Sequence, residues 1–343
     1  MSQPERPHPS VHTARGLARY QRPDLGRSLW QIANSVVPYI GLWFAMAWSL
    51  EVSYWLTLGL ALLAAGFLMR TFIIFHDCGH GAFFRARWAN EAVGFVTGLL
   101  ALTPSHDWWR RHLKHHATSG NLDRRGDGDV WTMTVREYRE SSRFKRIAYW
   151  FARHPLFMLT AGPIVMFAIL NRFPSRGARR RERLGVLGTN LALAAIVCAL
   201  VLALGWRAYL LIHLPVILFS GAMGIWLFYV QHQFEGVYWR RTPDWNHADA
   251  AVQGSSYLRL PRVLQWFSGN IGFHHVHHLS PRIPNYFLET CHREHPALQG
   301  VPVLDLLSTA GCFSLRLWDE ERGRLVGFAE AQRGGSRRDV VAA

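Results

Sequence analysis

Histidine is concentrated at three places in this chain, and the spacing within each place is suited to a metal ion. The sequence HDCGH contains His76 and His80, HLKHH begins at His112, and HHVHH begins at His274. Residues three and four positions apart lie on one face of an α-helix, so each group could direct its imidazoles to one side. Imidazole binds zinc, copper, iron or nickel. The three groups therefore predict a metal site but do not identify the metal.

One further histidine joins these groups if the chain folds back on itself. His232, in QHQFE, lies at the end of the last long apolar segment. A metal ion takes about four to six ligands, so the complete set of imidazoles is sufficient for two ions. The predicted ligands are His76, His80, His112, His115, His116, His232, His274, His277 and His278.

The second and third groups have the same pattern when HLKHH is laid over HHVHH. His274 then takes the place of His112, and His275 takes the place of Leu113. On a helix the three matched positions span an arc of about 100°, and the second position lies about 60° outside it. We therefore expect His275 to lie outside the ligand set, bonded to a neighbouring carboxylate or carbonyl or supporting a ligand.

The remaining histidines have no partner at ligand spacing, and we interpret them as structural or solvated residues. They are His8, His12, His106, His154, His213, His247, His292 and His295.

The composition indicates that these groups belong to a membrane protein. Of the 343 residues, 50% are hydrophobic and 18% are charged, and the formal net charge is +15. A basic chain with long apolar blocks suits anionic lipid headgroups better than nucleic acid. The four cysteines lie far apart and form neither a disulfide framework nor an iron–sulfur motif. The polar, proline-containing N-terminal residues do not resemble a secretory signal peptide.

Apolar segments of sufficient length predict four membrane crossings in two helical hairpins. About 20 mostly apolar residues are needed to cross the hydrocarbon core. Two shorter apolar runs, 92–103 and 156–170, are expected to be interfacial or re-entrant. The predicted fold is an all-α integral membrane protein with a cytoplasmic helical cap that carries the metal site. The predicted crossings are residues 29–50, 54–75, 186–204 and 209–230.

The distribution of arginine predicts the orientation in the membrane. The connection between the hairpins is rich in arginine, whereas the two hairpin turns contain only Arg207. Because basic loops stay in the cytoplasm, both termini and all the histidine groups are expected on the cytoplasmic side of the inner membrane. We predict a disordered cytoplasmic tail over 1–28, one membrane-embedded domain over 29–298 and a cytoplasmic tail over 299–343.

The histidine groups together resemble those of the membrane fatty acid desaturases. HDCGH, HLKHH and HVHHL with PRIPNY behind it occur around two apolar hairpins, and the resemblance covers about residues 30–298. ATSGNLDRRGDGDVWT and QHQFEGVYW are similar to segments of the bacterial acyl-lipid branch, and HDCGH to omega-6 and related enzymes. The resemblance implies an oxidoreductase that uses O2, two electrons and two non-haem iron ions to introduce a cis double bond into a fatty acyl chain. The implied iron ligands are the nine histidines named above.

Several other residues are candidates for supporting this site. Asn270 would share a helical face with His274, and the resemblance places an asparagine near the metals in some relatives. Trp108 and Trp109 precede the second histidine group and could line a substrate tunnel or lie at the membrane interface. The candidate supporting residues are Asn270, His275, Asp77, Asp123, Asp127, Asp129 and Glu235.

The chain contains no motif of its own for delivering electrons. The resemblance implies a ferredoxin or a small cytochrome as the external donor, and a membrane lipid or another acyl carrier as the substrate. Acidic donors could be steered by the positive cytoplasmic face, and anionic lipid explains the same charge. No nucleic acid partner is expected, and the sequence does not predict the oligomeric state.

Two alternatives stay open at the level of the sequence. A hydroxylase or a carotenoid ketolase would share the same histidine groups and the same two metals. A zinc-dependent hydrolase or a metal transporter would be a different class of protein. The hydrolase is disfavoured because HExxH is absent, and the transporter because the histidines lie at the ends of the apolar segments and not in their middle.

Overall fold

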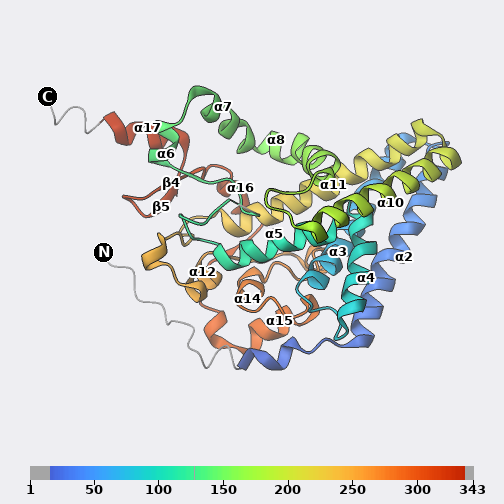
Figure 1. Ribbon diagram of the computed structural model, residues 1–343, viewed down its shortest axis with the longest axis horizontal. Helices are drawn as coiled ribbons and strands as arrows, with labels where there is room; N and C mark the ends of the chain where they lie inside the picture. The colour runs from blue at the N-terminus through green and yellow to red at the C-terminus, as the bar shows by residue number, and fades with distance from the viewer. Residues whose placement is uncertain (1–15, 127, 337–343) are drawn as a thin grey trace.

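The computed structural model describes residues 16–126 and 128–336, and this part of the chain is mainly helical. Two pairs of long helices lie side by side at one end of the molecule, and shorter helices and strands form a cap at the other end (Figure 1). The first pair is α2 (Leu25–Ser49) and α3 (Tyr54–Gly79). The second pair is α10 (Arg180–Leu204) and α11 (Trp206–His232).

Helix α3 is the central helix of the long-helix region. It packs against α2, against α11 and against the short helix α4 (Arg87–Leu100). Three of the described helices are long and apolar enough to cross a membrane, namely α3, α10 and α11. Helix α2 is 25 residues long, but it does not belong to this apolar set. The mainly helical fold is confirmed, and the fourth crossing stays a prediction.

The turn between α10 and α11 shows how the sequence produces such a tight hairpin. Helix α10 ends at Leu204, and α11 begins only two residues later at Trp206. The intervening Gly205 has a φ of +82°, which glycine adopts without steric cost because it has no Cβ. The two long helices therefore follow each other with a single linking residue.

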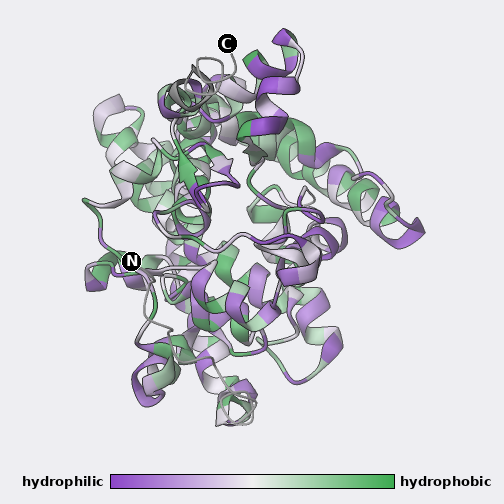
Figure 2. Ribbon diagram, turned by 90° about the vertical axis from the view of Figure 1, so that its left-hand side faces the viewer, coloured by the Kyte–Doolittle hydropathy of each residue, from purple (hydrophilic) through white to green (hydrophobic). Residues whose placement is uncertain are grey.

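Short elements surround the long helices and form the cap. Those that carry or support histidines are α5 (Ser105–Thr118), α14 (His274–Leu279) and α15 (Asn285–Glu294). The cap faces the viewer in Figure 2, where hydrophilic and hydrophobic residues are mixed. The other short helices are η1 (Ala18–Gln21), α6 (Val135–Glu140), α7 (Arg143–Ala152), α8 (Pro155–Leu159), α9 (Ala161–Pro163), η2 (Ile164–Ile169), η3 (Leu170–Arg172), η4 (Thr242–Asp244), α12 (His247–Gln253), α13 (Arg262–Phe267), η5 (Pro296–Leu298), α16 (Thr309–Cys312) and α17 (Phe328–Ser336).

Two small sheets hold the C-terminal part of the cap in place. In the first, β1 (Met133–Thr134) pairs in parallel with β4 (Leu317–Asp319), which pairs antiparallel with β5 (Arg324–Val326). In the second, β2 (Tyr257–Leu258) pairs in parallel with β3 (Val303–Leu304).

The boundaries of the two predicted tails differ from the structure. Residues 1–15 lie outside the described residues, but 16–28 already include η1 and the first turn of α2. Strands and helices also form within residues 303–336, and the side chains of Leu317 and Trp318 in this segment are buried. Apolar burial against Met133 and Tyr149, which are far away in the sequence, explains why this segment packs onto the cap.

The apolar run 156–170, which contains Gly162 and Pro163, is broken into short pieces. Helices α8 and α9 are separated by Thr160, whose φ of −120° and ψ of −76° are not helical. The following segment η2 is a π-helical turn. π-Helical turns are rare and often lie near functional sites.

Candidate metal centre

The structure brings the nine predicted ligands together from four helices. His76 and His80 lie at the C-terminal end of α3, and His232 is the last residue of α11. Helix α5 carries His112, His115 and His116, and α14 carries the third group. All nine side chains are buried.

The imidazoles form two adjacent groups, each compact enough to hold an ion. His76, His80, His112, His116 and His277 make up the first group, and His115, His232 and His278 make up the second. Within each group the ligand nitrogens lie within 4.8 Å of one another. The Nε2 atom of His274 lies 2.9 Å from that of His232, which attaches this residue to the second group.

The distances between nitrogens fit ligands that share a metal. The Nε2 atoms of His116 and His112 are 3.1 Å apart, and those of His277 and His116 are 2.9 Å apart. In the second group, the Nε2 atoms of His115 and His232 are 3.2 Å apart. Two nitrogens bound to one ion at a right angle, with bonds of about 2.1 Å, would be about 3.0 Å apart.

Some buried nitrogens in these groups have no hydrogen-bond partner among the described residues. They include both ring nitrogens of His80 and Nε2 of His278. A buried polar atom left without a partner costs about 1–3 kcal/mol. Coordination to a metal would satisfy one nitrogen of each ring, so the residues present fit a metal centre.

Five of the ligand histidines on α5 and α14 are held in the neutral form. Burial, followed by the neighbouring histidines, lowers the pKa of His112, His116 and His277 well below the usual range. The pKa of His274 and the pKa of His278 are lowered for the same reasons. A neutral imidazole keeps the lone pair that a metal ligand needs.

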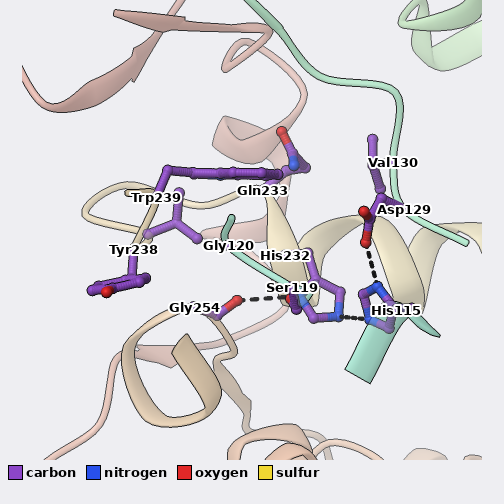
Figure 3. Close-up of a pocket in the computed structure, with 11 residues that line it drawn as sticks. His115, Ser119, Gly120, Asp129, Val130, His232, Gln233, Tyr238, Trp239 and Gly254 are labelled. Atoms are coloured by element: carbon purple, nitrogen blue, oxygen red, sulfur yellow. Dashed lines mark hydrogen bonds and ion pairs between the residues drawn. The ribbon is translucent and has the colours of Figure 1, made fainter. Parts of the chain in front are cut away.

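Three acceptors fix the orientation of ligand rings. Nδ1 of His76 donates to Asp77 over 3.0 Å, and Nδ1 of His115 donates to Asp129 over 2.5 Å. Nδ1 of His232 donates to the backbone oxygen of Gly254 over 3.1 Å. Figure 3 shows His115 between Asp129 and His232. Because carboxylate and carbonyl oxygens only accept, each Nδ1 carries the proton and each Nε2 is free for a metal.

Asp77 is itself held by the residue that follows PRIP in the third sequence motif. The backbone nitrogen and the Nδ2 atom of Asn285 donate to Asp77 over 2.7 and 2.9 Å. Sequence reasoning missed Asn285 and the Gly254 oxygen as parts of the site. The PRIPNY motif was a signal for Asn285, whereas nothing in the sequence distinguishes one backbone oxygen from another.

The other predicted supporting residues lie elsewhere. Asp123 accepts from Arg241 and from the backbone of Thr242, and Glu235 is exposed. Asp127 lies outside the described residues. Asn270 does not belong to α14: its φ is +58°, and its side chain bonds Gln265 and the backbone of Asn285. The helical spacing that placed it beside His274 does not apply, because a turn separates the two residues.

His275 lies outside both groups, on the side of α14 away from the ligands. Its Nε2 atom is 3.0 Å from Nδ1 of His292. Burial lowers the pKa of His275 to about 3. Another imidazole is thus one partner of the ring, and the backbone of Leu298 and of Ser256 also hydrogen-bonds it, as expected for a carbonyl. His292 is not the isolated residue that its spacing suggested. The remaining described histidines also lie outside the two groups.

An apolar cavity of about 510 Å³ reaches the histidines. His76, His112 and His274 line it together with Trp108, whose ring stacks on His112 with 4.4 Å between centroids. Along α11 the lining residues run from Ile217 to Gln231, a rise of about 21 Å along the helix. The cavity therefore extends from the metal ligands deep between the long helices.

Trp109, the second predicted tunnel residue, has a different role. Its Nε1 atom donates to the backbone oxygen of Phe75, and its ring lies against Gly79 and Gly94. A Cβ at Gly79 would lie 2.3 Å from Trp109 Cδ1. Trp109 thus fills the space between α3 and α4 and does not line the cavity.

Comparison with known proteins agrees with the resemblance that the histidine groups indicated. A family model described as "Fatty acid desaturase" matches residues 53–302. The chain is 48% identical over 321 residues to a protein of Bacillus subtilis named "Fatty acid desaturase", covering 94% of this chain and 91% of that protein. It is 27% identical to the "sn-1 oleoyl-lipid 12-desaturase" of Synechocystis, over 75% of this chain and 71% of the relative. It is 26% identical to the "sn-1 acyl-lipid omega-3 desaturase (ferredoxin)" of Nostoc, over 78% of this chain and 74% of the relative.

Proposed function

This chain belongs to the fatty acid desaturase family, and we propose that it introduces a cis double bond into an acyl chain of a membrane lipid. In this reaction O2 accepts two hydrogen atoms from the acyl chain, together with two electrons and two protons, and two water molecules are formed. The electrons come from an external donor. The chain is an oxidoreductase like the other members of its family.

The observation that carries the proposal is the position of the buried histidines at an apolar cavity. A methylene group in a saturated chain has no acidic proton and no leaving group, so side-chain acids, bases and nucleophiles alone cannot attack it. O2 is the oxidant, and two iron ions held by the histidines would activate it for attack on such a group. The first group would hold one ion, and the second group with His274 would hold the other.

The protein residues around the ions have separate tasks in this proposal. Asp77, Asp129 and the Gly254 oxygen keep the Nε2 atoms of three ligands directed at the metals. Trp108 forms the part of the cavity wall next to His112. The apolar lining binds the acyl chain by removing its methylene groups from water, at about 0.8 kcal/mol for each buried CH2.

A lipid-linked acyl chain and a ferredoxin are the substrate class and the donor that we propose. The names of two relatives describe acyl-lipid substrates, and one of these names includes ferredoxin. An acidic iron–sulfur protein would be attracted to a chain with a formal net charge of +15.

We also propose four crossings of the inner membrane, with the termini and the metal centre in the cytoplasm. Helix α2 supplies the fourth crossing, because Trp30, Val37 and Phe44 recur every seven residues on one face and are exposed by 69%, 66% and 74%. The membrane-embedded domain then covers residues 29–298. A reporter fused after Ala343 should be active only in the cytoplasm, and activity outside it would contradict this orientation.

The test of function is the lipid profile of a bacterial host that contains no O2-dependent desaturase. Expression of this chain with a ferredoxin and its reductase should give O2-dependent unsaturated acyl chains and about two iron ions per chain in the purified protein. The control is His116→Ala, which removes a ligand and should give neither product nor full iron content. Hydroxylated acyl chains in place of unsaturated ones would contradict the proposed reaction, as would purified protein that contains zinc and is inactive with iron.

A further inference from the structure

Small residues occupy the face of α11 that lines the cavity. Ser220, Gly221 and Gly224 all contribute to its wall. Glycine within a helix costs about 1 kcal/mol relative to alanine, so two glycines within one turn require a physical reason. Gly221 is required by the packing of α11 against its neighbours, whereas Gly224 is not.

Gly221 is explained by helix packing. A Cβ at this position would lie 2.6 Å from Pro163 Cβ and 3.3 Å from the ring of Phe167. Segments α9 and η2 therefore pass so close to α11 that no side chain fits between them. Replacing Gly221 would displace backbone, and a variant at this position would report on folding.

Gly224 is not required by packing. The nearest atom to an added Cβ would be Met69 Sδ, at 3.8 Å, which is an ordinary van der Waals contact. Its φ is not positive, so an L side chain is compatible with the backbone. A side chain at this position would therefore fill part of the cavity and leave the helices in place.

Gly224 and Met69 face each other at the same depth below the metal ligands. Gly224 lies seven residues before Gln231 on α11, and Met69 lies seven residues before His76 on α3. Seven residues of helix correspond to about 10 Å. Both residues line the cavity, so a chain that extends from the ligands toward the middle of the long helices passes beside them.

We infer that Gly224 determines which acyl chain lengths this enzyme accepts, by keeping open a passage along the cavity, beside Gly224 and Met69, for the part of the chain beyond the reacting carbon. This inference depends on the proposed desaturase function and orientation. Since the headgroup stays at the membrane surface, the methyl end is the part that passes Gly224. A larger side chain there should reject long chains more strongly than short ones.

The experiment compares stearoyl and myristoyl phosphatidylglycerol in vesicles with the purified enzyme, reduced ferredoxin and O2. Gly224→Leu should lower the ratio of unsaturated stearoyl to unsaturated myristoyl product roughly tenfold or more, because a pocket distinguishes a single methylene group by about 10-fold to 200-fold. Gly224→Ala should shift the ratio in the same direction by a smaller factor. Gly224→Leu combined with Met69→Ala should restore the ratio toward that of the unchanged enzyme, because the shortened side chain returns space to the passage.

The matched control is Gly59→Leu on α3, where an added Cβ would meet nothing within 4 Å and the residue is exposed. This variant should keep the ratio of the unchanged enzyme. An unchanged ratio in Gly224→Ala and Gly224→Leu would overturn the inference, and so would an equal change in Gly59→Leu. If Gly224→Leu does not accumulate, the ratio in Gly224→Ala decides. Absence of any unsaturated product from the unchanged enzyme would instead contradict the proposed function.

Discussion

His274 and His275 are adjacent and both buried, yet their rings have different neighbours. The Nε2 atom of His274 lies 2.9 Å from that of His232, which belongs to the second group. The ring of His275 instead contacts His292 on the other side of α14. Successive residues of a helix point about 100° apart, so the local geometry alone separates the two roles. The position of each histidine on the helix therefore predicts its role better than the residue type does.

We predict that His275→Gln keeps its iron and measurable desaturation, while His274→Gln loses both. Glutamine at 275 can still hydrogen-bond His292, whereas glutamine at 274 removes a nitrogen from the metal centre. Iron content by elemental analysis and product formation from lipid vesicles measure the difference. Equal loss of iron in the two variants would show that His275 is also a ligand.

A second prediction concerns the carboxylate that orients His115. In Asp129→Asn, the amide can present an N–H to Nδ1 of His115, which disfavours the ring orientation with a free Nε2. Loss of such a supporting partner typically lowers metal affinity about 10-fold to 100-fold. The matched control is Asp123→Asn, because Asp123 bonds Arg241 and Thr242 and does not contact the ligands. The rate of iron loss to a chelator should rise in the first variant only.

At the scale of elements, one amide connects three helices behind the first metal group. Asn285 on α15 bonds Asp77 on α3, and it exchanges hydrogen bonds of 3.1 Å with Gln31 on α2. All three side chains are buried. The junction fixes α15 and α2 against the end of α3, where His76 and His80 lie.

We therefore expect Asn285→Leu to destabilise the protein and loosen the metal centre. The substitution leaves the Gln31 amide without its partner and Asp77 with one donor fewer, at a cost of about 1–3 kcal/mol for each buried polar group. Thermal unfolding in detergent should show a lower midpoint, with reduced iron retention. Gln299→Leu is the control, because this exposed amide bonds only local backbone oxygens. A midpoint that falls equally in both variants would contradict the role of the junction.

At the scale of the whole molecule, the C-terminal segment completes the cap. Arg153 is only 1% exposed and donates to the backbone oxygen of Leu315 and to Gln233. The Tyr149 hydroxyl donates to the backbone of Arg316, and β4 pairs with β1. Residues beyond 299 thus cover buried polar groups of α7 and the C-terminal end of α11.

Truncation after Gly300 should consequently abolish the accumulation of folded protein, whereas truncation after Ser336 should not. The shorter chain loses the Leu315 oxygen that accepts from Arg153, and the burial of Leu317 and Trp318. Protein recovered from membranes after detergent extraction, and its monodispersity in gel filtration, provide the measurement. Normal recovery of the shorter chain would mean that residues 301–336 are dispensable for the fold.

The sequence by itself determined the ligand groups and the elements that present them. Helical spacing selected His112, His115 and His116 and excluded His275, because positions on one helix are related by local geometry alone. Long apolar segments predicted α3, α10 and α11 for the same reason, since the length needed to cross a membrane is a local property of the chain.

Only the tertiary structure decided which groups meet. The division into two ligand groups mixes residues from α3, α5, α11 and α14, and no spacing along the chain contains this information. Asp123 and Asp129 follow the same histidine group and were both candidate supporting residues, yet only Asp129 bonds a ligand histidine. The cap that buries Leu317, the His275–His292 pair and the passage beside Gly224 likewise depend on contacts between distant residues. Such contacts follow from the packing of the complete chain, which local periodicity does not predict.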